Sequence, residues 1–213
     1  MRYLLKGIIT LGVVAAGVAT VMVLKIVAPR RPVGDRSGVS LRVKGNPRAA
    51  VKIVEFMDFS CPPCAAGSKM LKRFMAAHPQ AIQIEMNYFP LHLENKALSA
   101  RYAQCAAEQG QFWPMFDLLV ERQAVWKSML NPETAFQQMA AELKLNPKAL
   151  QQCVAAPQTF KTILTSRQQG QAQGVESTPT YFINGKMVVG SQALAEVLKE
   201  IAAGKVKGYA AVT

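Results

Sequence analysis

Two cysteines, Cys61 and Cys64, stand on either side of a Pro-Pro pair in the stretch FMDFSCPPCAAG. Thiols at this spacing can bind a metal, form a structural disulfide, or exchange disulfides with other molecules. Cys61 is expected where a strand ends and a helix begins, and the unpaired N–H groups at a helix N-terminus favour its thiolate and lower its pKa. Cys64 lies one turn further in and should be more buried. Pro62 suits the first helical turn and Pro63 adds rigidity, so the stretch predicts one attacking and one resolving sulfur.

Three other uses of this cysteine pair are disfavoured by spacing and geometry. A zinc site needs a second close pair of ligands, whereas Cys105 and Cys153 are far apart and His78 and His92 show no ligand spacing. A copper-carrying chaperone would be expected to have a wider cysteine spacing and a histidine ligand. A purely structural disulfide at this spacing would close a very small ring and contribute little to stability. Dithiol chemistry is therefore the favoured interpretation, and no metal or other cofactor is expected.

The residues around the cysteines predict the elements that hold them. Val51–Phe59 is rich in β-branched and aromatic residues, which indicates a buried strand that ends just before Cys61. Apolar residues then recur at helical spacing, and Ala81–Pro90 alternates as a second strand would. The active cysteines are therefore expected at the junction of the first strand and the first helix.

The middle of the chain has a different composition. Residues 95–173 are rich in Ala, Gln, Leu and Met and almost free of strand signals, so we expect four or five helices. Asn131-Pro132 and Asn146-Pro147 each place a capping residue before a proline at the first helical position.

Strand signals return near the C-terminus. Thr180–Ile183 and Lys186–Val189 flank Asn184-Gly185, a strong hairpin signal, and Ser191 is expected to cap a closing amphipathic helix. The order is strand, helix, strand, helical block, hairpin and helix. It predicts an α/β fold with a mixed sheet and an inserted all-helical domain.

An apolar run, Gly7–Leu24, is the clearest targeting signal. It is longer than a typical signal-peptide apolar region, and no good cleavage site follows it. We therefore favour an uncleaved transmembrane anchor over residues 1–27, with a cleaved signal peptide as the alternative, and expect a Pro- and Gly-containing tether over residues 28–38. Both flanks of the run are basic, so charge alone does not set its orientation. The net charge is +12, but Lys and Arg are scattered, which favours a solvated basic surface over a nucleic-acid site.

Taken together, VEFMDFSCPPC, STPTYFINGK and the helical block between them resemble the DsbA-like thiol:disulfide oxidoreductases of the thioredoxin superfamily. The resemblance implies a thioredoxin-like domain made of residues 39–94 and 174–213, interrupted by a helical insertion over residues 95–173. It also implies that Thr178-Pro179 is the family's cis-proline loop, which lies against Cys61 and pairs with an extended substrate peptide. Without the resemblance, an ordinary trans bond in a turn would be the expectation.

Two further expectations depend on this resemblance. Glu55 would be the buried acid that shuttles a proton for Cys64, although a satisfied structural acid remains the alternative; Asp58 should point to the opposite face of the strand. Cys105 and Cys153 would form a second, non-catalytic disulfide, and two lone buried thiols remain the alternative.

The resemblance implies partners and a location as well. Substrates would be proteins with thiols or disulfides, and Pro62, Pro63, Thr178 and Pro179 would contact them. A membrane redox partner, either a quinone-linked oxidase or an electron-conveying reductase, would reset a monomeric enzyme anchored in the cytoplasmic membrane with its catalytic domain on the periplasmic side. Oxidase activity is favoured over reductase activity. The alternatives are a disulfide isomerase and a redox-linked metal-delivery or assembly factor for envelope proteins.

Overall fold

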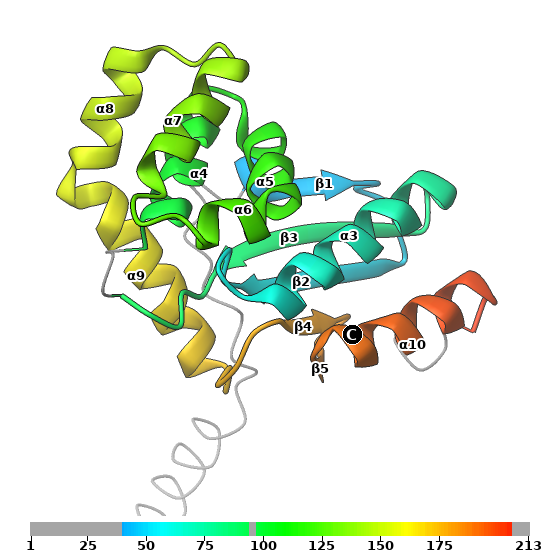
Figure 1. Cartoon of the computed structure of the whole chain (residues 1–213). Coiled ribbons are helices and arrows are strands. Elements are labelled where there is room, and N and C mark those ends of the chain that lie inside the picture. The colour runs from blue at the N-terminus through cyan, green and yellow to red at the C-terminus, as the bar shows by residue number, and fades with distance from the viewer. Residues whose placement is uncertain (1–39, 94–96, 206–213) are drawn as a thin grey trace, which may run out of the picture. The chain divides into compact units, whose positions relative to one another are not determined.

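A five-stranded mixed sheet forms the centre of the fold in a computed structural model that describes residues 40–93 and 97–205 (Figure 1). The strand order is β1-β3-β2-β4-β5, in which β2 and β3 run parallel and the other neighbours are antiparallel. The strands are β1 (Val43–Gly45), β2 (Val51–Met57), β3 (Ile82–Tyr88), β4 (Thr180–Ile183) and β5 (Lys186–Val189). A short 3-10 turn, η1 (Ser40–Arg42), precedes β1. The predicted hairpin has its expected bounds, whereas β1 is too short to leave a periodic signal.

One face of the sheet is covered by α3 (Pro62–Ala77) and α10 (Ser191–Ala202). Alternate residues of β2, among them Val51 and Ile53, pack there against Leu71 and Leu194 from the two helices. The expectation that Ser191 caps α10 is wrong, because Gly190 occupies the capping position with φ +91°. Residues with a side chain rarely adopt that conformation, so the turn requires glycine ahead of the helix.

Six helices lie between β3 and β4 in the described part of the chain, one or two more than expected. A break at Arg122 separates two of them. As expected, Asn146 caps the helix at Pro147 by accepting from the Ala149 N–H at 3.0 Å. The same expectation for Asn131 is wrong, because that helix begins at Glu133 and Pro132 occupies the capping position. The helices are α4 (Leu98–Glu108), α5 (Phe112–Glu121), α6 (Gln123–Lys127), α7 (Glu133–Glu142), α8 (Pro147–Ala155) and α9 (Pro157–Ala172).

The last of these helices covers the second face of the sheet. Gly170 of α9 lies so close to the rings of Phe56 and Phe89 that a Cβ there would be 2.7 Å from the Phe89 ring and 2.9 Å from that of Phe56. The two faces are therefore covered by different parts of the chain, α3 and α10 on one and α9 on the other. The α/β fold with a mixed sheet and an inserted helical block is as the sequence predicts.

The expected anchor over residues 1–27 and the tether over residues 28–38 lie outside the described residues. Within residues 40–93 and 97–205, no helix is both long and apolar enough to cross a bilayer.

Candidate active site

The turn between β2 and α3 is shaped by Asp58. Its Oδ1 accepts from the backbone N–H of Ser60 at 2.7 Å, and its Oδ2 accepts from the N–H of Leu91 at 2.9 Å. The N–H of Cys61 donates to the Asp58 carbonyl at 3.1 Å. Asp58 therefore fixes the loop that delivers Cys61 to the start of the helix.

Cys61 is the N-cap residue of α3, where Pro62 and Pro63 open the helix. Both prolines are exposed and Cys61 is partly exposed, whereas Cys64 is fully buried. The Cys61 carbonyl accepts from the N–H groups of Cys64 at 3.1 Å and Ala65 at 3.2 Å, as the first turn of a helix requires. The accessible and the buried thiol thus have the positions that their spacing predicts.

The two thiols titrate in opposite directions. Donation from the Cys64 thiol, helped by a contact with Thr178 and by the Cys64 N–H, lowers the pKa of Cys61 to about 6 against the opposing effect of burial. Burial, followed by the hydrogen bond to Cys61, raises the pKa of Cys64 well above its usual range. At neutral pH, the reduced site therefore holds a Cys61 thiolate beside a protonated Cys64 thiol.

The loop before β4 faces the accessible thiol. The Thr178–Pro179 peptide bond is cis, and the Cys61 Sγ lies 3.4 Å from the Thr178 carbonyl oxygen, to which it donates when it is protonated. The Pro179 carbonyl accepts from the Gly190 N–H at 2.9 Å, which ties this loop to the start of α10. The structure therefore brings Thr178 and Pro179 to the dithiol from the far end of the chain.

Glu55 lies on β2, on the face that α3 covers, and is fully buried. Burial raises the pKa of its carboxyl to about 8, against the opposing influence of the Tyr181 and Ser68 hydroxyls. Neither contact has the length and angle of a regular hydrogen bond among the described residues. The carboxyl is therefore mostly protonated at neutral pH. It loses its proton when the pH rises by about one unit.

Gln123 is a site residue that the sequence did not reveal. From α6 of the insertion, its Nε2 donates to the Phe59 carbonyl at 2.6 Å and to the Cys61 carbonyl at 2.9 Å. A glutamine in a Gln-rich helical stretch carries no pattern that marks it as special. Only the partners, 64 and 62 residues away in sequence, give this side chain its role.

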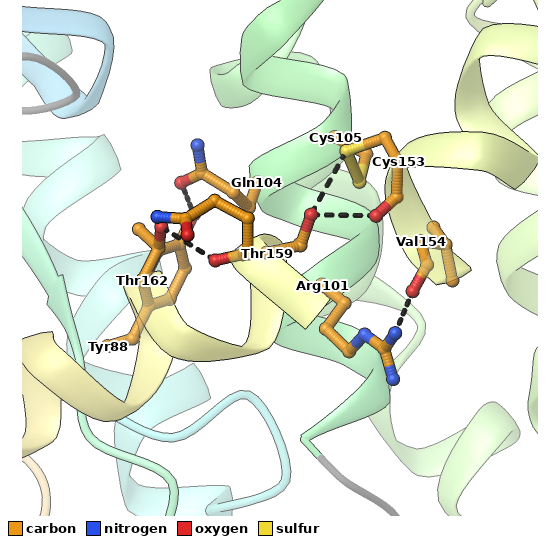
Figure 2. Close-up of a disulfide and its surroundings, with 9 residues drawn as sticks. Tyr88, Arg101, Gln104, Cys105, Cys153, Val154, Thr159 and Thr162 are labelled. Carbon is orange, nitrogen blue, oxygen red and sulfur yellow. Dashed lines mark hydrogen bonds between the residues drawn. A yellow bond between two sulfur atoms is a disulfide. The ribbon is translucent and has the colours of Figure 1, made fainter. Parts of the chain in front are cut away.

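Cys105 and Cys153 form a disulfide that joins α4 to α8 (Figure 2). The Thr159 hydroxyl at the start of α9 donates to the Cys153 carbonyl at 2.7 Å and lies 3.5 Å from its Sγ. Next to the bond, the Arg101 guanidinium donates to the Val154 carbonyl. The disulfide therefore belongs to the packing of the helical insertion, apart from the Cys61–Cys64 site.

No group of three His, Cys, Asp or Glu side chains in the described ranges is arranged to hold a metal ion. A cavity nearby is lined by residues of the active-site loop, including Asp58 and Ser60, and by Trp126 and Phe136 of the insertion. It lies between the thioredoxin-like part and the insertion, so both contribute to the surroundings of the site.

A family model described as Thioredoxin matches residues 39–203. The chain belongs to the thioredoxin family. A solved thioredoxin-like oxidoreductase from Silicibacter pomeroyi DSS-3 is 25% identical, with a TM-score of 0.65 over 83% of this chain and 99% of that one. The thiol-disulfide exchange protein alpha-DsbA2 from Wolbachia pipientis shares the fold, with 19% identity and a TM-score of 0.66 over 81% of this chain and 89% of that one. The expected membership of the thioredoxin superfamily is therefore confirmed, and the chain shares its fold with a solved DsbA-type protein.

Sequence relatives also include a Na⁺/H⁺ antiporter NhaA from Herminiimonas arsenicoxydans. It is 28% identical over 149 residues, which are 70% of this chain and 23% of that protein. This thioredoxin-family chain thus spans about a quarter of the length of the curated relatives it matches. The activity in their name is that of much longer proteins.

Proposed function

We propose that this chain is a protein thiol–disulfide oxidoreductase that works as an oxidase, donating the Cys61–Cys64 disulfide to substrate proteins. The observation that carries the proposal is the pairing of a partly exposed, acidic Cys61 with a buried, non-acidic Cys64 at the start of α3. Thr178 faces Cys61, and the exposed Pro62 and Pro63 border it. An extended substrate segment that pairs with the backbone at Thr178 would bring a substrate sulfur to Cys61.

The exchange is balanced in atoms and electrons. A substrate thiolate attacks the Cys61 sulfur, a mixed disulfide forms, and Cys64 leaves as a thiolate that takes a proton from the neutral Glu55 carboxyl. A second substrate thiolate then attacks the substrate sulfur of the mixed disulfide, and Cys61 leaves as a thiolate. The substrate has lost two electrons and gained a disulfide, while the enzyme holds the reduced pair.

The direction of electron flow follows from the leaving group. A thiol of low pKa leaves faster and is more stable as a thiolate, and only the reduced enzyme contains that thiolate. A lowered Cys61 pKa therefore stabilises the reduced enzyme and makes its disulfide more oxidising. Water screens this partly exposed group, so the gain is smaller than the pKa shift alone would give.

We propose further that residues 1–27 anchor the chain in the cytoplasmic membrane with the dithiol on the extracytoplasmic side. Four cysteines, two of them in a disulfide of the insertion, suit an oxidising compartment. A membrane redox partner would then restore the working redox state of the enzyme. A quinone-linked oxidase would reoxidise it if it is an oxidase, whereas an electron-conveying reductase would reduce it if it runs in reverse. The enzyme acts as a monomer.

The test is the equilibrium potential of the Cys61–Cys64 pair in the full chain, measured in glutathione buffers and combined with oxidation of a reduced two-cysteine peptide. We expect a potential well above about −270 mV, the value of thioredoxin, and rapid peptide oxidation. Cys61→Ser should abolish the oxidation, whereas the Cys61 thiolate of Cys64→Ala should attack oxidised glutathione in the buffer and remain as a mixed disulfide, with reduced glutathione released. A potential near that of thioredoxin would make the enzyme a reductase, and exchange by the Cys61→Ser variant would refute the dithiol mechanism.

A further inference from the structure

Four buried polar atoms without regular partners lie together beneath α3, the helix that follows Cys61. They are the two carboxyl oxygens of Glu55, the Ser68 hydroxyl and the Tyr181 hydroxyl, and all four are buried within the described part of the chain. Buried polar atoms are nearly always hydrogen-bonded, so a cluster of unsatisfied ones points to a function that needs them. These atoms come from three elements, β2, α3 and β4.

The pairing of the central strands places two of these groups together. Glu55 of β2 and Tyr181 of β4 are direct partners in the antiparallel register. Side chains of such partners point to the same face of the sheet. Both therefore project under α3, the helix that carries Cys61 and Cys64.

A glycine in α3 makes room for the phenol. A Cβ built on Gly67 would lie 2.1 Å from the Tyr181 hydroxyl oxygen, whereas the nearest ring carbon is 3.4 Å away. Glycine in a helix interior is less stable than alanine, so this position has a reason other than helix formation. Because Gly67 has no side chain, the Tyr181 hydroxyl can lie directly against α3 at this position.

The phenol is within electrostatic range of the two sulfur atoms. Burial, followed by the charges of Glu55 and Cys64, raises the pKa of Tyr181 well above its usual range, so the hydroxyl stays protonated. It can therefore act only as a donor to a neighbouring anion. In the proposed exchange, Cys64 takes a proton from Glu55, and the anion that results is the Glu55 carboxylate.

We propose that Tyr181 is a positioning residue for proton transfer at the dithiol: its hydroxyl, admitted by Gly67, donates to the Glu55 carboxylate and orients it toward Cys64. This inference rests on the proposed function and adds a residue to it. The proton moves between Glu55 and the Cys64 sulfur, and Tyr181 keeps its own proton throughout. The loose contact between Tyr181 and the neutral carboxyl tightens when the carboxyl becomes charged.

The decisive measurement is the titration of the Glu55 carboxyl by ¹³C NMR in the full chain carrying Cys61→Ser and Cys64→Ser, with and without Tyr181→Phe. Removing one hydrogen bond to a carboxylate should raise the Glu55 midpoint by about one pH unit. The other polar and charged groups that face Glu55 or the cavity beside it stay the same in both proteins. They are Ser68 and Lys72 of α3, Lys44 of β1 and Asp117 of α5.

Gly67→Ala provides the matched control for position. The added methyl group displaces the hydroxyl, so this variant should raise the Glu55 midpoint as Tyr181→Phe does. In the Tyr181→Phe background, the same methyl group meets the ring carbon at 3.4 Å and Leu194 Cδ2 at 3.7 Å, both ordinary contact distances, so it should add no further shift. A Glu55 midpoint that either single variant leaves unchanged would overturn the proposal.

The rate of disulfide exchange separates this proposal from the proposed function. With the cysteines restored, Tyr181→Phe should move the midpoint of the pH–rate profile upward by the same amount as the carboxyl titration. A protein that fails to exchange disulfides at any pH would refute the proposed function, while the NMR titration would still decide the role of Tyr181. A uniform loss of rate with an unchanged profile would mean that Tyr181 is only structural.

Discussion

Replacing Glu55 by Gln should remove a large pH dependence of stability. The pKa of the carboxyl rises from 4.5 to about 8 because folding buries it completely. A carboxyl that binds its proton more tightly in the folded state stabilises the fold below the unfolded pKa, and this stability is lost as the pH rises from about 4.5 to about 8. With one pH unit equal to about 1.4 kcal/mol, the two pKa values imply a loss of about 3 kcal/mol between pH 5 and pH 8.

The assay is urea unfolding followed by circular dichroism at several pH values between 5 and 8. The parent carries Cys61→Ser and Cys64→Ser, because the reduced Cys61 thiolate would add stability with rising pH, opposite to the effect of Glu55. Glu55→Gln preserves size and polarity but has no proton to lose, so the difference between the two unfolding free energies isolates the carboxyl. Glu200→Gln, a change at an exposed glutamate, is the control. Parallel stability profiles for the parent and Glu55→Gln would refute the argument that Glu55 is buried with a raised pKa.

Three other outcomes are expected. Thiolate absorbance of the reduced chain should titrate with a midpoint near pH 6, and Cys64→Ala should raise that midpoint by removing the donor to Cys61; a parent midpoint near 9 would contradict the site geometry. Gln123→Leu should cost about 1–3 kcal/mol in urea unfolding, because a buried backbone carbonyl of the active-site loop loses its donor, and an unchanged midpoint would exclude that contribution. Replacing Cys105 and Cys153 by Ala opens a loop of 48 residues, which should cost about 4 kcal/mol in the same assay while disulfide exchange continues.

The parts of the fold that local patterns specify could be predicted from the sequence. The hairpin at Asn184-Gly185 has its expected bounds because that turn depends on two neighbouring residues. Cys61 begins α3 as expected, since the strand pattern, the prolines and the helical pattern all meet there. The start of α10 was misplaced by one residue, because the conformation of Gly190 depends on the turn out of β5 and not on a capping preference.

The parts of the site that depend on distant pairing could not be predicted in this way. Tyr181 becomes a partner of Glu55 only through the register of β4 on β2, and a tyrosine in a strand pattern indicates no more than packing. In the sequence, Gly67 indicates only a residue that lowers helix stability. Its role becomes clear from the Tyr181 hydroxyl that lies against it in the structure. Gln123 likewise acquires its role only when α6 packs on the active-site loop. Sequence patterns thus located the thiols, and tertiary packing supplied the groups that hold and tune them.

The contact between Cys61 and Thr178 joins residues 117 positions apart, with the whole helical insertion between them. A chain that emerges from the ribosome N-terminus first exposes Cys61 and Cys64 long before Thr178 and β4 exist to complete their surroundings. Until β4 arrives, the central strand β2 has an open edge, and Cys105 and then Cys153 appear as competing partners for the same thiols. Early closure of Cys61 with its near neighbour Cys64 would protect the nascent protein from such mispairing. The order in which the cysteines are synthesised therefore favours the native pairs before the site itself has formed.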